Sequence, residues 1–268
     1  MNITLYKQML KVNMKGFINY SAGSAFYVLL MSWFYPSIAK NLSAINGLID
    51  SMPEGVGRAL GLNGYDSAEA FISGEYYGLI LVLILAIMSV QLAVRLMARM
   101  IDRGSMAYLL SAPTTRGKVA FTQASVLTTG LFIMMAVTTL AGFVGKAWFL
   151  RDYEFAGVRF IELNVAAFLL FFAVSGIAFL VSALSNDEKK AFSVSGFITF
   201  GFFSLDILAK LSDQVAWMKH ITIFTLYKPG EIIHGTADVA ESFAVLAAIG
   251  LVSYGLAIVL FRRRDLPL

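Results

Sequence analysis

Six runs of largely apolar residues, separated by polar stretches, constrain what this 268-residue chain can fold into. The runs cover residues 16–39, 76–94, 120–143, 161–184, 191–211 and 242–261. A helix that crosses the hydrocarbon core of a bilayer needs about 20 largely apolar residues, and each run supplies about that length. The sequence therefore predicts an all-α polytopic membrane protein with six transmembrane helices, in which residues 1–268 form a single membrane domain.

Composition supports a chain whose surface faces lipid. Apolar residues make up 58% of the sequence and charged residues 14%, whereas soluble domains carry about 25% charged residues. The absence of cysteine excludes disulfides, thiolate metal sites and a cysteine nucleophile. Lysine and arginine lie between the apolar runs and form no continuous basic face, so nucleic acid is not an expected partner.

The distribution of lysine and arginine predicts the orientation of the chain. The tails and connections at one end of the six helices hold 13 of these residues, and the connections at the other end hold 8. The second group is spread over the longer connections, which include an outer loop (40–75) and an outer segment (212–241). Acids such as Glu69 and Glu75 offset part of its positive charge. Because cytoplasmic connections carry the excess of positive charge, both termini are expected in the cytoplasm.

Residues 1–15 are amphipathic. Lys7, Lys11 and Lys15 follow one another at a spacing of four residues, so a helix places them on one stripe. We expect an elbow helix that lies flat in the inner interface, with its lysines at anionic headgroups and its apolar side in lipid. The alternative is an ordinary positively charged flank that fixes the topology.

The connection between the second and third runs, residues 98–118, predicts a short helix outside the membrane. Asp102 can cap this helix, and Pro113 disfavours helix at the residue before it. Thr114 or Thr115 can then cap the helix that enters the third run. The apolar residues of the short helix are Met106, Leu109 and Leu110, with Tyr108 beside them. A helix of this kind suits docking into a groove on a partner protein.

Three segments carry a resemblance to a known family. They are DRGSMAYLLSAPTTRGKVAFTQ (102–123), ITIFTLYKPGEIIHG (221–235) and the closing FRRRDLPL (261–268). In order and placement they resemble the coupling-helix region, the stretch before the last helix and the C-terminal end of ABC-2-type transporter permeases. Together with six runs and an elbow-like N-terminus, the resemblance covers most of the chain.

The resemblance implies a half-transporter of an ATP-driven exporter. Two copies, or two related chains, form the pathway, with the first and fifth helices at their seam, and two ABC ATPase subunits dock underneath. The implied ATPase interface comprises Asp102, Arg103, Gly104, Ser105, Met106, Tyr108 and Leu109. Implied cargoes are amphipathic peptides, antibiotics, lipid-linked glycans or other hydrophobic compounds, and the implied location is a prokaryotic plasma membrane.

The chain itself contains no G-x-x-x-x-G-K-[ST] phosphate loop. If transport is driven by ATP, the nucleotide and its magnesium ion must therefore bind to the partner subunit. This chain is accordingly not expected to be an enzyme or to hold a cofactor.

Five residues are candidates for a role in the pathway or its gating. Asp206 lies within an apolar run, where an ionisable group is a functional candidate, and Lys210 can pair with it one turn later. A solvated pair near the outer interface is the favoured alternative. Pro229, Gly230 and Glu231 lie in residues 225–235, which form either a re-entrant segment broken at Pro-Gly or an ordinary outer loop.

Other classes of function fit less well. An intramembrane enzyme needs matched catalytic groups within the membrane, but His220 and His234 lie outside the six runs. Their spacing also makes a poor metal site. An ion-driven secondary transporter should show inverted repeats or several intramembrane charges. A membrane immunity or sensor protein without transport remains an alternative, and an associated ATPase would distinguish the exporter from it.

Overall fold

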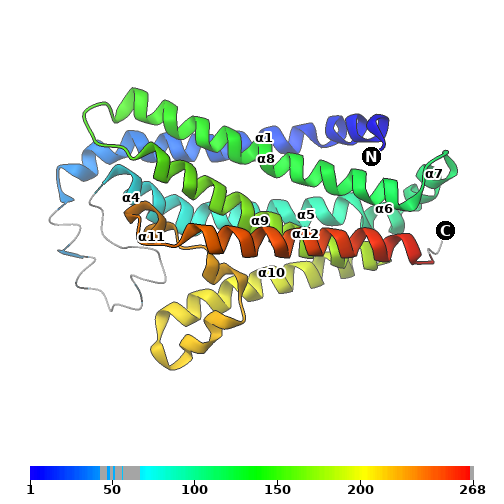
Figure 1. The fold of residues 1–268 in the computed structure, drawn as a ribbon. Coiled ribbons are helices and arrows are strands. Elements are labelled where there is room, and N and C mark those ends of the chain that lie inside the picture. The colour runs from blue at the N-terminus through cyan, green and yellow to red at the C-terminus, as the bar shows by residue number, and fades with distance from the viewer. Residues whose placement is uncertain (43–46, 49–50, 52–55, 57–66, 266–268) are drawn as a thin grey trace.

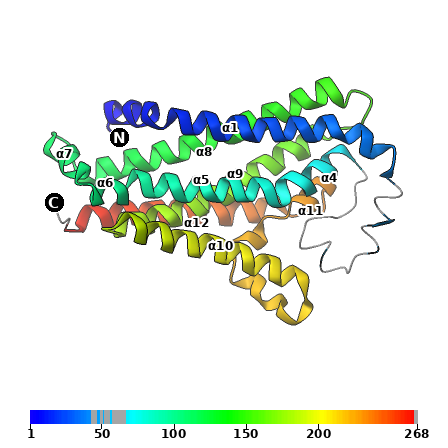
Figure 2. The same ribbon diagram turned by 180° about the vertical axis from the view of Figure 1, so that it is seen from behind.

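The computed structural model describes residues 1–42, 47–48, 51, 56 and 67–265, and these residues contain helices and no strand. Six long helices form an elongated bundle (Figure 1). They are α1 (Ile3–Ala39), α5 (Leu81–Leu96), α8 (Arg116–Phe149), α9 (Gly157–Leu184), α10 (Glu188–Leu211) and α12 (Val239–Arg263). The N-terminus, the end of α12 and the short helices α6 (Ala98–Asp102) and α7 (Ser105–Ser111) lie at one end, the terminal end. The short helices α4 (Ala68–Ile72) and α11 (Pro229–His234) lie at the other, the loop end (Figure 2).

Five helical units among the described residues are long and apolar enough to cross a membrane. They are Ala68–Asp102, Arg116–Phe149, Gly157–Leu184, Glu188–Leu211 and Val239–Arg263. The first unit contains α4, the π-helical segment η1 (Ser73–Ile80), α5 and α6. Helix α1 is longer than any of these, but Asn19, Ser21 and Ser24 interrupt its apolar stretch. The protein is therefore a helical membrane protein with five candidate crossings, to which α1 adds a sixth long helix.

Helix starts differ from the predicted ones because side-chain caps extend helices beyond the apolar runs. Ser67, Thr115, Asp187 and Asp238 each accept a hydrogen bond from a backbone N–H in the first turn of the helix that follows. The unit Ala68–Asp102 is the clearest correction, since residues 68–75 were expected in the outer loop and are helical. Most of the rest of that loop lies outside the described residues.

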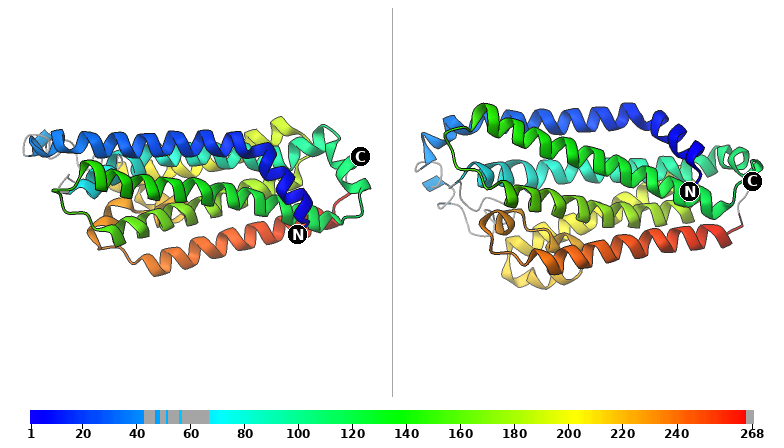
Figure 3. Two further views of the ribbon diagram at one scale, coloured as in Figure 1. Left: turned by 90° about the horizontal axis from the view of Figure 1, so that it is seen from above. Right: turned by 45° about the horizontal axis from the view of Figure 1, so that its top comes forward.

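The N-terminal segment also differs from its prediction. Residues 1–15 and 16–39 were expected as an elbow and a separate span, but α1 is one uninterrupted helix. Its first turns bend relative to the rest (Figure 3). Leu5 is buried against protein, and Tyr6 shares a hydrogen bond of 2.7 Å with Thr129 of α8. The apolar side of this segment therefore packs partly on α8, whereas the prediction placed it in lipid, and Lys7 points to solvent.

Small residues bring the long helices together. Helix α1 packs mainly on α8, and α9 packs mainly on α12. At Gly130 of α8 an added Cβ would overlap the ring of Phe17 of α1, and at Gly250 of α12 it would overlap the ring of Phe172. Glycines at such positions let aromatic rings pack directly against a neighbouring backbone, as is common between membrane helices.

The segment after α10 folds into three short helices at the loop end. They are η2 (Asp213–His220), η3 (Ile223–Leu226) and α11. Pro229 and Gly230 were expected to break a helix, but Pro229 occupies the first turn of α11. Proline is favoured there because its missing N–H has no intrahelical partner in any case. Helix α11 ends at His234 and is followed by Gly235, whose φ of 71° is left-handed and favours glycine.

Candidate functional site

At the terminal end, α6 and α7 form a short projection that we call the peg (residues 98–111). Gly104 adopts a φ of 70°, a left-handed conformation that lets the chain turn sharply from α6 into α7. Helix α7 ends at Ser111, with Ala112 extended before Pro113, as the sequence predicted. The Thr115 hydroxyl then caps α8 by accepting the N–H of Lys118 at 3.3 Å. The peg thus ends before Pro113, and the capped helix α8 follows it.

The peg is attached to the bundle where α5 ends. The backbone of Met97 departs from helical geometry, with φ of −124° and ψ of −77°. The helix is therefore interrupted between α5 and α6. The buried side chain of Ser182, in α9, bridges this interruption by hydrogen bonds. Its hydroxyl donates to the carbonyl of Ala93 at 2.9 Å and accepts the N–H of Ala98 at 3.0 Å. One side chain therefore satisfies both backbone groups that the change of direction would leave unpaired.

The peg is also joined to the start of α10. Asp102 was expected to cap the short helix, but it ends α6 and its carboxylate accepts the N–H of Glu188 at 3.1 Å. The carboxylate of Glu188 pairs with Arg99 at 3.3 Å and with Arg103 at 3.4 Å. These groups are partly exposed, so each ion pair adds little stability alone. Their combined effect is to hold the peg in one orientation against α10.

The predicted interface residues differ in their surroundings, and Ser105 is exposed while Leu109 is half-buried. Asp102, Arg103 and Gly104 position the peg, and Met106 is fully buried beneath it. Tyr108 instead projects into solvent, with 83% of its surface exposed. Among the exposed positions of the peg, Tyr108 carries the aromatic group best placed to meet a partner.

Beside the peg, hydrogen bonds of Arg264 at the C-terminal end of α12 connect this helix to α8 and α9. The Arg264 guanidinium donates to the carbonyls of Ala183 at 2.7 Å and Ser185 at 3.3 Å, and to the side chain of Asn186. The guanidinium of Arg116, at the start of α8, donates to the Arg264 carbonyl. Partial burial lowers the pKa of Arg264, but a guanidinium stays protonated in proteins. The terminal ends of α8, α9 and α12 are thereby held together.

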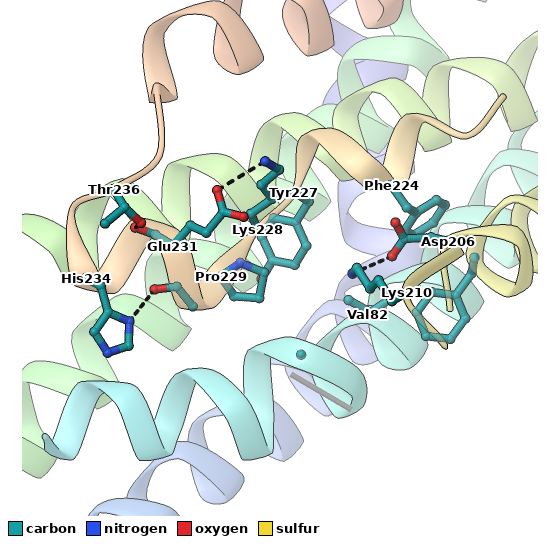
Figure 4. Close-up of a pocket in the computed structure, with 13 residues that line it drawn as sticks. Val82, Asp206, Lys210, Phe224, Tyr227, Lys228, Pro229, Glu231, His234 and Thr236 are labelled. Carbon is teal, nitrogen blue, oxygen red and sulfur yellow. Dashed lines mark hydrogen bonds and ion pairs between the residues drawn. The ribbon is translucent and has the colours of Figure 1, made fainter. Parts of the chain in front are cut away.

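A pocket of about 440 Å³ lies at the loop end, between α10, α11 and η1 (Figure 4). All five predicted pathway residues line it: Asp206, Lys210, Pro229, Gly230 and Glu231. The other lining residues are Gly78, Val82, Phe203, Phe224, Tyr227, Lys228, His234 and Thr236. The fold thus brings residues from three stretches of chain, 78–82, 203–210 and 224–236, to one cavity.

Asp206 and Lys210 form the predicted ion pair, with a separation of 2.6 Å. The expectation of a solvated pair is wrong for the acid, because Asp206 is only 4% exposed. Its second oxygen accepts the hydroxyl of Thr225 at 3.3 Å, and Lys210 keeps part of its surface in contact with solvent. A buried carboxylate with two partners is thus presented to the pocket.

Other groups of the lining are fixed by local contacts. Lys228 pairs with Glu231 at 3.1 Å, and His234 Nδ1 lies 2.7 Å from the Gly230 carbonyl. Tyr227 donates its hydroxyl to the Tyr77 carbonyl in η1 at 3.2 Å, and burial raises the pKa of its phenol. π-Helical turns occur often at functional sites, and here η1 contributes Gly78 to the cavity.

Residues 7–266 match the sequence model of a family described as ABC-2 family transporter protein. The chain belongs to the ABC-2 transporter family. A search of curated proteins gives no match. Because the matched range contains both the peg and the pocket, both features of this ABC-2 protein lie within the family's own domain.

One buried acid of this ABC-2 protein was missed. The sequence predicts Glu69 in the outer loop, but it lies in α4 and is 4% exposed. One carboxylate oxygen accepts the N–H of Ala156, and the other has no hydrogen-bond partner among the described residues. The capping residue Ser67, placed before a run that continues into the apolar segment, was the signal that could have found it.

Proposed function

We propose that the chain is the membrane-spanning permease subunit of an ATP-driven exporter, and that separate ATPase subunits act on it through the peg. The observation that carries this proposal is the exposure of Tyr108 on the short helix α7 at the terminal end of an ABC-2 family protein. An exposed aromatic group on a rigid helix suits insertion into a groove of a partner. The ATP and its magnesium ion would bind to that partner.

The exporter topology requires α1 to be a sixth crossing with both termini in the cytoplasm. At 37 residues, α1 is about 55 Å long, which exceeds the thickness of the hydrocarbon core. Some of the polar residues that lower the mean hydropathy of α1 face the rest of the protein. The buried Ser24 hydroxyl, for example, forms hydrogen bonds with Tyr76 and Thr138. Apolar side chains such as Phe26 remain exposed toward lipid. The excess of lysine and arginine at the terminal end supports a cytoplasmic orientation.

Helix α10 is the element that can carry motion from the peg to the pocket. Its first residue, Glu188, is bound to the peg, and Asp206 and Lys210 near its other end line the pocket. A helix is stiff along its axis, so a displacement of the peg moves both ends of α10. We propose that the five pathway residues respond to the ATPase in this way.

The functional unit is proposed to be a dimer of this chain, or a pair with a related chain, in the plasma membrane of a prokaryotic cell. Helix α10 is the least covered of the five candidate crossings, and Phe197 on it is 81% exposed. A second permease seated near α1 and α10 would cover this face. The cargo class is amphipathic, in keeping with the aromatic and charged lining of the pocket.

The proposal is tested with Tyr108→Asp, which places a charge at the expected contact without touching the core. The matched control is Thr4→Asp, which adds the same charge at another exposed position near the terminal end. We expect Tyr108→Asp to abolish co-purification of the ATPase subunits and cargo-stimulated ATP hydrolysis, and Thr4→Asp to leave both intact. If recruitment and transport both survive Tyr108→Asp, the peg is not the coupling element. If no ATPase accompanies the wild-type chain after gentle solubilisation, the exporter assignment itself is wrong.

A further inference from the structure

A second pocket adjoins the first at the loop end. It has a volume of about 290 Å³ and lies between α11 and the start of α12. Lys228 and Glu231 line both pockets, so their ion pair forms the partition between them. Both side chains are 47% exposed. An exposed pair of this kind is weakly held, so a competing charge can open the partition.

The two pockets carry an excess of negative charge. Their described linings contain four carboxylates against two lysines: Asp206, Glu231, Asp238 and Glu241 against Lys210 and Lys228. Arg159 approaches Gly235 from behind, but it pairs with Glu162 at 2.9 Å and adds no net charge. Asp238 also caps α12 by accepting the N–H of Ala240 at 3.2 Å, which orients this carboxylate without neutralising it. A ligand must therefore supply positive charge.

The walls between these charges are apolar. Phe203, Phe224 and Tyr227 line the first pocket, and Leu226, Ile232 and Phe243 line the second. Cavities of about 300–1,000 Å³ that combine apolar walls with a few oriented polar groups are typical of small-molecule sites. The first pocket falls in this range, and the second extends it. An apolar chain can therefore lie along the aromatic residues while a charged group meets the carboxylates.

We propose that the two pockets form one groove that binds a cationic amphipathic molecule. Its cationic group takes the place of Lys228 as the partner of Glu231, which opens the partition and joins the two pockets. Its apolar part packs against Phe203, Phe224 and Phe243. The proposal rests on the proposed function in one respect, because it names the chemistry of the cargo that the exporter carries.

Binding is measured on the full chain in nanodiscs of zwitterionic lipid, without ATPase. The probe is a dodecylammonium derivative with a diazirine in its alkyl chain, compared with a dodecyl sulfate derivative that carries the same diazirine. We expect the cationic probe to label peptides from residues 203–243 and to be competed by unlabelled dodecylamine. We expect labelling of the same peptides by the anionic probe to be at least about tenfold weaker, the factor that corresponds to about one lost charge interaction.

Glu231→Gln removes the charge at the partition from a half-exposed position, so the fold should be retained. The matched control is Glu154→Gln, which removes an exposed carboxylate outside the groove. We expect Glu231→Gln to reduce labelling by about tenfold and Glu154→Gln to leave it unchanged. Asp238→Asn is a second variant within the groove and should lower labelling in the same direction.

Three results would overturn the proposal: equal labelling by the two probes, labelling spread over the lipid-facing helices, or labelling that persists in both groove variants. Because no ATPase is present, these results concern only the groove. A chain that fails to recruit an ATPase yet labels as expected would instead contradict the exporter function and leave the binding site standing.

Discussion

The carboxylate of Asp102 accepts the backbone N–H of Glu188 at 3.1 Å, so the end of α6 caps the first turn of α10. The residues are 86 positions apart in the chain, and the bond joins the proposed ATPase contact to a helix that reaches the pocket. Asp102 therefore helps to fix the orientation of the peg.

The first prediction concerns this cap. Asp102→Ala removes the acceptor and should lower the free energy of unfolding by about 1 kcal/mol, as for the loss of a helix cap. Asp102→Asn keeps a carbonyl oxygen in place and should lie close to the wild type. Thermal denaturation of the purified chain in detergent measures both. Equal losses for the two variants would show that the hydrogen bond contributes nothing.

The second prediction concerns the ion pairs of Glu188. Glu188→Arg places a cation between Arg99 and Arg103, so we expect cargo transport to become uncoupled from ATP hydrolysis. Stability should change by less than about 1 kcal/mol, because the groups are partly exposed. Adding Arg103→Glu restores one pair of opposite charge and should recover part of the coupling. The ratio of cargo transported to ATP hydrolysed is the measurement, and a swap that recovers nothing would argue against a role for the pair.

The third prediction concerns the change of direction between α5 and α6. Ser182→Ala removes the buried hydroxyl that pairs with the N–H of Ala98 and the carbonyl of Ala93. We expect a loss of about 1–3 kcal/mol in the free energy of unfolding. Ser195→Ala is the control, since Ser195 is equally buried but its hydrogen bond to the Ala178 carbonyl is long, at 3.5 Å. Similar losses in both variants would remove the special role of Ser182.

The fourth prediction concerns the contact of α1 with α8. An alanine at Gly130 would place its Cβ against the Phe17 ring. The expected cost is about 1–3 kcal/mol, as for other overpacked cores. Gly23→Ala is the control, because its Cβ would meet nothing within 4 Å and alanine favours helix by up to about 1 kcal/mol. Unfolding temperatures that fall for Gly130→Ala and hold or rise for Gly23→Ala are the expected result. The packing account fails if the two variants behave alike.

The fifth prediction concerns orientation. Because the chain has no cysteine, a single one can be introduced as a label. Gln214→Cys in η2 should react with a membrane-impermeant maleimide in intact cells, and Ser111→Cys on the peg should react only after permeabilisation. Both positions are exposed, so accessibility to reagent is decided by the side of the membrane. The opposite pattern would place the peg outside and end the proposed coupling to a cytoplasmic ATPase.

Features that short stretches of chain encode can be predicted from the amino-acid sequence alone. The apolar runs locate the helices, Pro113 stops the peg, Thr115 starts α8, and Lys210 meets Asp206 because they lie one helical turn apart. Each of these depends on hydropathy, capping or helix geometry within a few residues, so each can be predicted without knowing what lies beside it.

Which helix faces meet became known only from the folded structure. Helices in a membrane are apolar on nearly every side, so periodicity does not reveal which side of α10 is buried or that Thr225 covers Asp206. The partner of Asp102 was hidden for the same reason, because Glu188 reaches it only when α6 and α10 pack together. Both the attachment of the peg and the shape of the groove arise from contacts between segments that are distant in the sequence. Such contacts depend on how the helices pack, and a local sequence pattern does not reveal this packing.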